Sequence, residues 1–212
     1  WNCALTSDDP AERANAVENV RKYLQIAALI GAEAVLVVPG ATRVAWDPSR
    51  PVVSYRNAWE NATAAIREIV PVAEKLKVCL AVENVWNRFL ISPMEWKFFL
   101  DQFKSEYVGI YFDSGNACLT GRPQDFPEIL GSYIKAVHLK NFEETDCAGG
   151  LHGFGDDLLK GVVDFKALFA ALDKIGYKGP FTVEMIPFSR LPDLVLPDQA
   201  LADKMAAQVA QL

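Results

Sequence analysis

The chain has 212 residues, of which 51% are hydrophobic and 23% charged, and it carries a formal net charge of -6 with a pI near 5.0. This composition is typical of a globular protein, and the length favours one domain over residues 1–212. The acidic balance offers no basic face to a polyanion, which excludes nucleic acid as the expected partner. No apolar run approaches the roughly 18 residues of a membrane-spanning helix and no signal peptide is visible, so we expect a cytoplasmic protein without a membrane partner.

The cysteine pattern agrees with a reducing compartment. The sequence has 4 cysteines, they are far apart, and none forms a C-x-x-C pair. We therefore expect reduced thiols rather than disulfides or a thiolate metal site. The residues are Cys3, Cys79, Cys118 and Cys147.

The first elements in the chain are a capped helix and an apolar strand. Thr6–Pro10 resembles a helix start with proline just inside it, and Gly31 is placed to end that helix. Ala34–Gly40 follows and is so uniformly apolar that we expect a fully buried, central parallel strand. The loop over 41–51 is long for a connection between a strand and a helix, which favours a functional role.

Strands and helices continue to alternate. A helix is expected over 54–76, with a kink or break near Val70 because Pro71 falls inside the pattern. A strand follows at 78–83, and Ser92–Pro93 opens the next helix. The remaining expected elements are strands at 108–113, 134–140 and 180–186, helices at 125–131, 164–175 and 198–212, and a long polar loop at 141–161.

This alternation predicts an α/β fold with a parallel sheet wrapped by helices. Five strands do not close a (β/α)8 TIM barrel, which usually needs around 250 residues. Because the five strands would leave such a barrel incomplete, we expect about three N-terminal βα units upstream of Trp1. The alternative is an open five-stranded sheet that binds its ligand where the strand order reverses.

Four of the expected strands end on a side chain that can bind a metal ion: Glu83, Asp113, His138 and Glu184. One acidic residue at a strand end is usually a helix cap or a solvated loop residue, and one histidine is usually a satisfied core residue. Four such residues in successive parallel strands share one face of the sheet, where barrel enzymes place their sites. The pattern therefore favours a functional site.

The chemistry of this set points to a divalent ion. Three carboxylates and an imidazole at close quarters need a cation to offset their charge. Oxygen-rich ligation favours Mn²⁺, Mg²⁺ or Co²⁺ over a structural zinc. Such an ion can polarise a substrate carbonyl, which makes the neighbouring C–H acidic enough for Glu83 or Glu184 to remove its proton, with the other returning it.

The same strand ends carry a family resemblance. The segments Ala81–Asn84, Tyr111–Asn116, Val137–Lys140 and Thr182–Met185 resemble the xylose isomerase-like sugar phosphate isomerase/epimerase superfamily, including ketose 3-epimerases and L-ribulose-5-phosphate 3-epimerase-like proteins. The resemblance covers the chain from about its third residue to about Ile186. It implies a TIM barrel of which this chain holds the C-terminal five βα units.

The resemblance also implies site residues and a cofactor. It implies that Glu83, Asp113, His138 and Glu184 bind one divalent metal ion, commonly Mn²⁺, and that the two glutamates double as the acid/base pair. The chain departs from ketose epimerases at Asn116, where they carry a histidine.

Candidate substrate-binding residues lie on or after the strand ends, where cationic and polar groups could hold a phosphate or hydroxyls. For each of them a solvated loop position is the alternative. They are Arg88, Asn116, Lys140 and His152, with Arg43 and Trp46 in the first long loop.

These features predict a metal-dependent isomerase or epimerase of a ketose or sugar phosphate that acts through a metal-stabilised enediolate. The alternatives are a dehydratase of a keto-sugar or inosose on the same site, and a non-catalytic sugar-binding or regulatory module. The superfamily also includes metal-dependent DNA-repair endonucleases. Their metal site contains several histidines, whereas this chain has 2 histidines in all, so it fits them poorly. The expected partner is a small sugar or sugar phosphate, and a homo-oligomer is left open.

Overall fold

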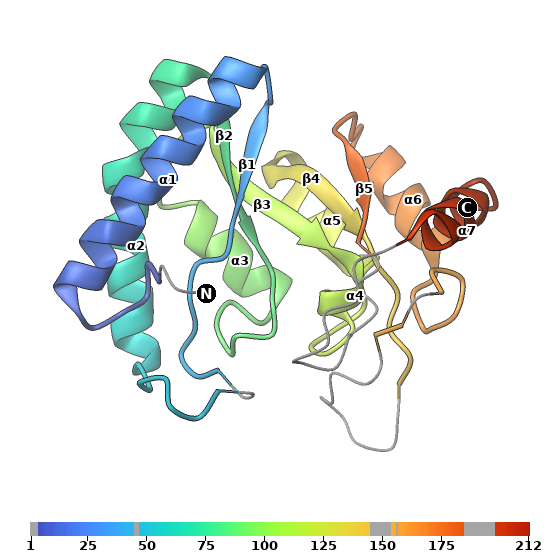
Figure 1. Ribbon diagram of the computed structural model, residues 1–212, viewed down its shortest axis with the longest axis horizontal. Helices are drawn as coiled ribbons and strands as arrows, with labels where there is room; N and C mark the ends of the chain where they lie inside the picture. Colours follow the sequence, from blue (N-terminus) through green and yellow to red (C-terminus); the bar gives the residue numbers. More distant parts are fainter. Residues whose placement is uncertain (1–3, 45–46, 145–153, 156, 185–197) are drawn as a thin grey trace. The chain divides into compact units, whose positions relative to one another are not determined.

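Helices and strands alternate along the chain, as the sequence predicts (Figure 1). The computed structural model describes residues 4–44, 47–144, 154–155, 157–184 and 198–212. Its five strands form one sheet in the order β1-β2-β3-β4-β5. The strands are β1 (Ala34–Val37), β2 (Cys79–Glu83), β3 (Val108–Asp113), β4 (Ile134–Leu139) and β5 (Phe181–Val183).

Apart from the short α4, the helices lie close to their predicted positions. They are α1 (Pro10–Ile30), α2 (Tyr55–Leu76), α3 (Pro93–Leu100), α4 (Ser114–Ala117), α5 (Asp125–Leu130), α6 (Phe165–Lys174) and α7 (Gln199–Val209), with a 3-10 turn η1 (Gly131–Tyr133). Within the described part of the chain, no helix combines the length and the apolar character that a membrane span requires.

The structure divides into two compact units. Unit 1 comprises residues 1–112 and 132–136, and unit 2 comprises residues 113–131 and 137–212. Within unit 1, β1 pairs in parallel with β2, and β2 with β3. Within unit 2, the end of β4 pairs in parallel with β5. These pairings confirm the parallel arrangement expected from the sequence.

Side-chain caps explain where the long helices of unit 1 begin and end. Asp9 caps α1 by accepting a hydrogen bond from the Ala11 amide, and Gly31 ends the helix at φ 75°. Ser54 caps α2 in the same way through the Asn57 amide. Such side-chain acceptors satisfy amides that a helix leaves without an internal partner.

Two elements of unit 1 differ from the sequence-based expectations. Helix α2 continues through Pro71, so the break, one of the two expected outcomes there, does not occur; apolar residues on both sides, such as Ile66 and Ala73, stay buried and hold the helix in place. Strand β1 is not fully buried: in the part of the chain that the structure describes it pairs with β2 alone, and Leu36 is 36% exposed. Apolar composition alone does not reveal how many neighbours a strand has.

The core of unit 1 includes a group of aromatic rings beneath α3. Phe99 is fully buried and meets Trp59, Phe89 and Phe103 edge-on, with ring centroids 5.0, 6.0 and 5.2 Å away. Edge-to-face contacts of this kind add to the free energy gained from burial. The group anchors the segment that follows β2.

In unit 2 a buried asparagine ties the end of β4 to the segment before α6. Asn141 donates through Nδ2 to the Leu158 carbonyl at 2.9 Å and accepts through Oδ1 from the amides of Phe142 and Val163 at 2.9 and 3.0 Å. Gly161 passes so close that a side chain there would meet the Asn141 amide. These hydrogen bonds therefore fix the backbone conformation of the segment that follows β4.

We expect Asn141→Ala to lower the free energy of unfolding by about 2–4 kcal/mol, because it leaves several buried backbone groups without a partner. Urea denaturation followed by circular dichroism measures this loss. Gln25→Ala, at an exposed position of α1, is the control and should change stability by less than about 0.5 kcal/mol. Equal midpoints for the two variants would contradict the role assigned to Asn141.

Candidate functional site

Three of the predicted metal ligands come together in unit 2. Asp113 is fully buried at the end of β3, His138 is buried in β4, and Glu184 follows β5. His138 Nδ1 lies 3.7 Å from both Asp113 Oδ2 and Glu184 Oε2. Ligand atoms of the three residues all lie within 4.8 Å of one another. The prediction that these strand ends share one place is therefore confirmed for these three residues.

Strand pairing explains how His138 and Glu184 meet. In the parallel register of β4 and β5, His138 lies opposite Thr182 and Leu139 opposite Val183. The Glu184 amide then donates to the Leu139 carbonyl at 3.1 Å, which extends the ladder by one residue. The backbone, rather than a flexible loop, thus positions this carboxylate.

Asp113 uses its two carboxylate oxygens differently. Oδ1 accepts a hydrogen bond from the Asn116 amide at 2.6 Å and caps α4, a short helix that the sequence analysis did not predict. Oδ2 faces His138 and the ammonium of Lys140. Burial by itself would raise the pKa of Asp113, but the Lys140 charge, together with the neighbouring His138 and the hydrogen bond from the Asn116 amide, outweighs it and holds that pKa below its usual range. A lowered pKa favours the charged carboxylate, which is the form that binds a cation.

Lys140 lies among the ligand carboxylates. Its Nζ is 2.8 Å from Glu184 Oε2 and 3.6 Å from Asp113 Oδ2, and it lies 4.5 Å from the centroid of the Phe154 ring. The Lys140 side chain is only 8% exposed. The substrate-binding role that the sequence analysis assigned to this residue stays a prediction; in the structure its ammonium pairs with Asp113 and Glu184.

Sequence analysis missed two residues that shape this site. Ser114 Oγ accepts from the Lys140 amide at 3.0 Å and lies 2.7 Å from the Lys140 carbonyl, to which it donates. Gly115 packs against the stem of Lys140 so tightly that a Cβ there would lie 2.7 Å from Lys140 Cγ. Their position directly after Asp113 is the one sequence signal that points to them.

The fourth predicted ligand, Glu83, lies in unit 1. It ends β2, it is buried at 6% exposure, and in the parallel register it lies opposite Tyr111 of β3. Asn84, the next residue, is also buried. Burial of the Glu83 carboxylate at a strand end argues against the alternative of a solvated loop residue and favours a functional position.

The other candidate residues belong to different parts of the chain. Arg88 is exposed in unit 1, with a left-handed φ of 57°, and Arg43 is exposed as well. Asn116 is half-buried in α4 of unit 2. His152 and Trp46 lie outside the described residues.

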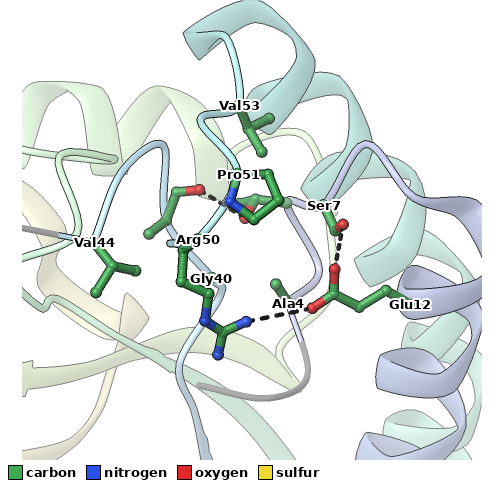
Figure 2. A pocket seen from close by; sticks show the side chains of 10 residues that line it. Ala4, Ser7, Glu12, Gly40, Val44, Arg50, Pro51 and Val53 are labelled. Carbon is green, nitrogen blue, oxygen red and sulfur yellow. Dashed lines mark hydrogen bonds and ion pairs between the residues drawn. The ribbon is translucent and has the colours of Figure 1, made fainter. Parts of the chain in front are cut away.

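Unit 1 also contains a small cavity between the start of α1 and the loop after β1 (Figure 2). Its volume is about 40 Å³, which is room for a few water molecules. Glu12 Oε2 accepts a hydrogen bond from Ser7 Oγ at 2.5 Å, and Glu12 Oε1 lies 3.7 Å from Arg50 Nη1. The two charged side chains that line the cavity therefore form an ion pair with each other. None of the predicted site residues lines it.

The donor set in unit 2 fits a divalent cation. Ligands that each lie about 2.0–2.3 Å from one ion are separated by no more than about twice that length, and separations of 3.7 Å satisfy this limit. Thiolates are a poor alternative: Cys79 and Cys118 are free, and burial raises the pKa of Cys118 to about 12. Cys3 and Cys147 lie outside the described residues.

A parallel sheet with intervening helices, whose strands end in carboxylates and a histidine, is typical of the α/β barrel class. The chain belongs to the xylose isomerase-like TIM barrel family, whose model matches residues 2–207. The family confirms the predicted resemblance and favours the barrel over the open sheet.

Named relatives are sugar epimerases. The chain is 28% identical over 189 residues to the L-ribulose-5-phosphate 3-epimerase UlaE of Salmonella paratyphi C, covering 85% of this chain and 60% of that protein. Its fold matches a D-allulose 3-epimerase from Methylomonas sp. with a TM-score of 0.77 at 22% identity, covering 99% of this chain and 73% of that one. Its fold also matches the 3-keto-D-glucoside 4-epimerase YcjR of E. coli with a TM-score of 0.76 at 16% identity, and the match covers 99% of this chain and 76% of that one.

We expect Ser114→Ala to lower the free energy of unfolding by about 1–3 kcal/mol, because the buried Lys140 amide loses its acceptor. Thermal and urea denaturation both measure this change. Ser132→Ala, at an exposed position after α5, is the matched control. A loss no larger than that of the control would refute the structural role of the Ser114 hydroxyl.

Proposed function

We propose that the protein is a divalent-metal-dependent epimerase or isomerase of a ketose or sugar phosphate. The observation that carries this proposal is the close group of Asp113, His138 and Glu184 at the ends of parallel strands. Membership of the xylose isomerase-like family and the epimerase names of its relatives support it. The expected substrate is a small sugar in the cytoplasm.

Glu83 is the proposed fourth ligand. In the parallel register it lies opposite Tyr111, and Asp113 follows two residues later on the same strand. A buried position at the end of a parallel strand is the position that the sequence pattern assigns to all four ligands. Burial of both carboxylates supports this assignment.

Mn²⁺ is the proposed ion, with Mg²⁺ and Co²⁺ as alternatives, because carboxylate-rich sites with one imidazole suit these ions. When bound, the ion would polarise the carbonyl of a ketose and make the neighbouring C–H more acidic. Glu83, Asp113, His138 and Glu184 would hold it.

The acid/base work is assigned to the two glutamates. One carboxylate takes the proton from the carbon next to the carbonyl, the C–H electron pair forms a C=C bond, and the carbonyl oxygen takes up the charge of the resulting enediolate. Return of a proton to the opposite face inverts that carbon. Because inversion needs one acid/base group on each face, two glutamates suit an epimerase.

Substrate positioning is assigned to Arg88, Asn116 and His152, whose polar groups suit hydroxyls or a phosphate. Glu184 is 27% exposed on its side chain, so it is the ligand in unit 2 most accessible to a substrate. It is therefore the better residue with which to test catalysis.

The test is proton exchange in D₂O. We expect the protein with Mn²⁺ to introduce deuterium next to the carbonyl of one member of a ketose and ketose-phosphate panel, and Glu184→Gln to lower that rate at least 10³-fold by removing the base. Proton NMR follows both exchange and the appearance of the epimer.

The surface variant Glu60→Gln is the control and should retain the full rate. Exchange accompanied by loss of a hydroxyl would replace the epimerase with a dehydratase. Absence of exchange across the panel, with Mn²⁺ bound, would favour a sugar-binding module.

Metal binding is tested separately by isothermal titration calorimetry. We expect one Mn²⁺ per chain, and Asp113→Asn should weaken binding at least tenfold because it removes a charged ligand. Mn²⁺ at about 100 times its Kd should stabilise the protein by about 2.7 kcal/mol. Asp173→Asn, exposed on α6, is the control, and equal affinities in the two variants would exclude Asp113 as a ligand.

A further inference from the structure

Lys140 is placed on the same oxygens that would bind the metal ion. Its Nζ approaches Glu184 Oε2 at 2.8 Å and Asp113 Oδ2 at 3.6 Å. The same two oxygens are the ones that lie 3.7 Å from His138 Nδ1. The ammonium and a divalent ion would therefore share ligand atoms.

The position of this ammonium is built into the fold. Strand β4 ends at Leu139, and Ser114 Oγ fixes both the amide and the carbonyl of Lys140. Gly115 leaves room for the stem, since a Cβ there would lie within 2.7–3.2 Å of three Lys140 atoms. The Phe154 ring lies 4.5 Å from Nζ, a distance typical of cation–π contacts. A solvated lysine would need none of these contacts.

Charge explains what the ammonium does there. Asp113 is fully buried, and two ionised carboxylates at close quarters without a cation would be strongly destabilising. The Lys140 ammonium supplies that cation within the chain itself. A divalent ion on the same oxygens would repel it at short range.

Resting on the metal site put forward above, we propose that Lys140 is an internal counter-cation which holds Asp113 and Glu184 together in the metal-free protein, and that a divalent ion binds only by displacing its ammonium from these carboxylates. Lys140 is thus a positioning residue for the metal centre. It keeps the ligands assembled between metal-binding events and sets the affinity for the ion.

The test compares Lys140→Met, which keeps the stem and removes the charge, with Lys140→Arg, which keeps the charge. We expect Lys140→Met to bind Mn²⁺ at least tenfold more tightly than wild type, equivalent to 1.4 kcal/mol, by isothermal titration calorimetry. Lys140→Arg should stay within threefold of wild type. The melting temperature of metal-free Lys140→Met should fall below that of wild type, and saturating Mn²⁺ should remove the difference.

A second variant tests the same inference if Lys140→Met fails to fold. Gly115→Ala keeps every charge but forces the Lys140 stem to shift, so it should tighten Mn²⁺ binding in the same direction. Unchanged or weaker Mn²⁺ binding by Lys140→Met, with wild type binding Mn²⁺ and exchanging protons, would overturn this inference alone. Failure of wild type to bind any divalent ion would overturn the proposed metal site and this inference with it.

Discussion

The cluster of charged residues in unit 2 depends on one electrostatic constraint: a buried carboxylate is kept close to a second carboxylate. Asp113 is fully buried, and the Lys140 ammonium lies beside both it and Glu184. Without a cation this arrangement would force one carboxylate to take up a proton or move away. The surrounding backbone is organised to supply that cation and to hold it in place.

The backbone meets this constraint through the ends of parallel strands. His138 lies within the register of β4 and β5, and Glu184 continues the ladder through a hydrogen bond to Leu139. Asp113 ends β3 and at once caps α4, so one carboxylate both shapes the backbone and faces the site. Rigid strand ends of this kind give the positional accuracy that metal ligation requires.

The names of similar proteins cover different sugars. The chain resembles proteins named as epimerases of L-ribulose-5-phosphate, D-allulose and a 3-keto-D-glucoside. Proton removal next to a carbonyl is a step open to all such substrates, whereas substrate selection falls to loops beyond the strand ends. Arg88 and Asn116 are among the residues proposed above for substrate positioning.

The sequence by itself determined the alternation of strands and helices and the placement of three strand-end residues that the structure brings together. Apolar runs that end on Asp113, His138 or Glu184 depend only on local pattern and strand direction. It did not reveal that α2 continues through Pro71, that Leu36 is partly exposed, or that Ser114 and Gly115 hold Lys140. These features depend on contacts between segments distant in the chain. Only the tertiary structure decided that Lys140 faces Asp113 and Glu184, since a side chain's partner is set by what packs around it.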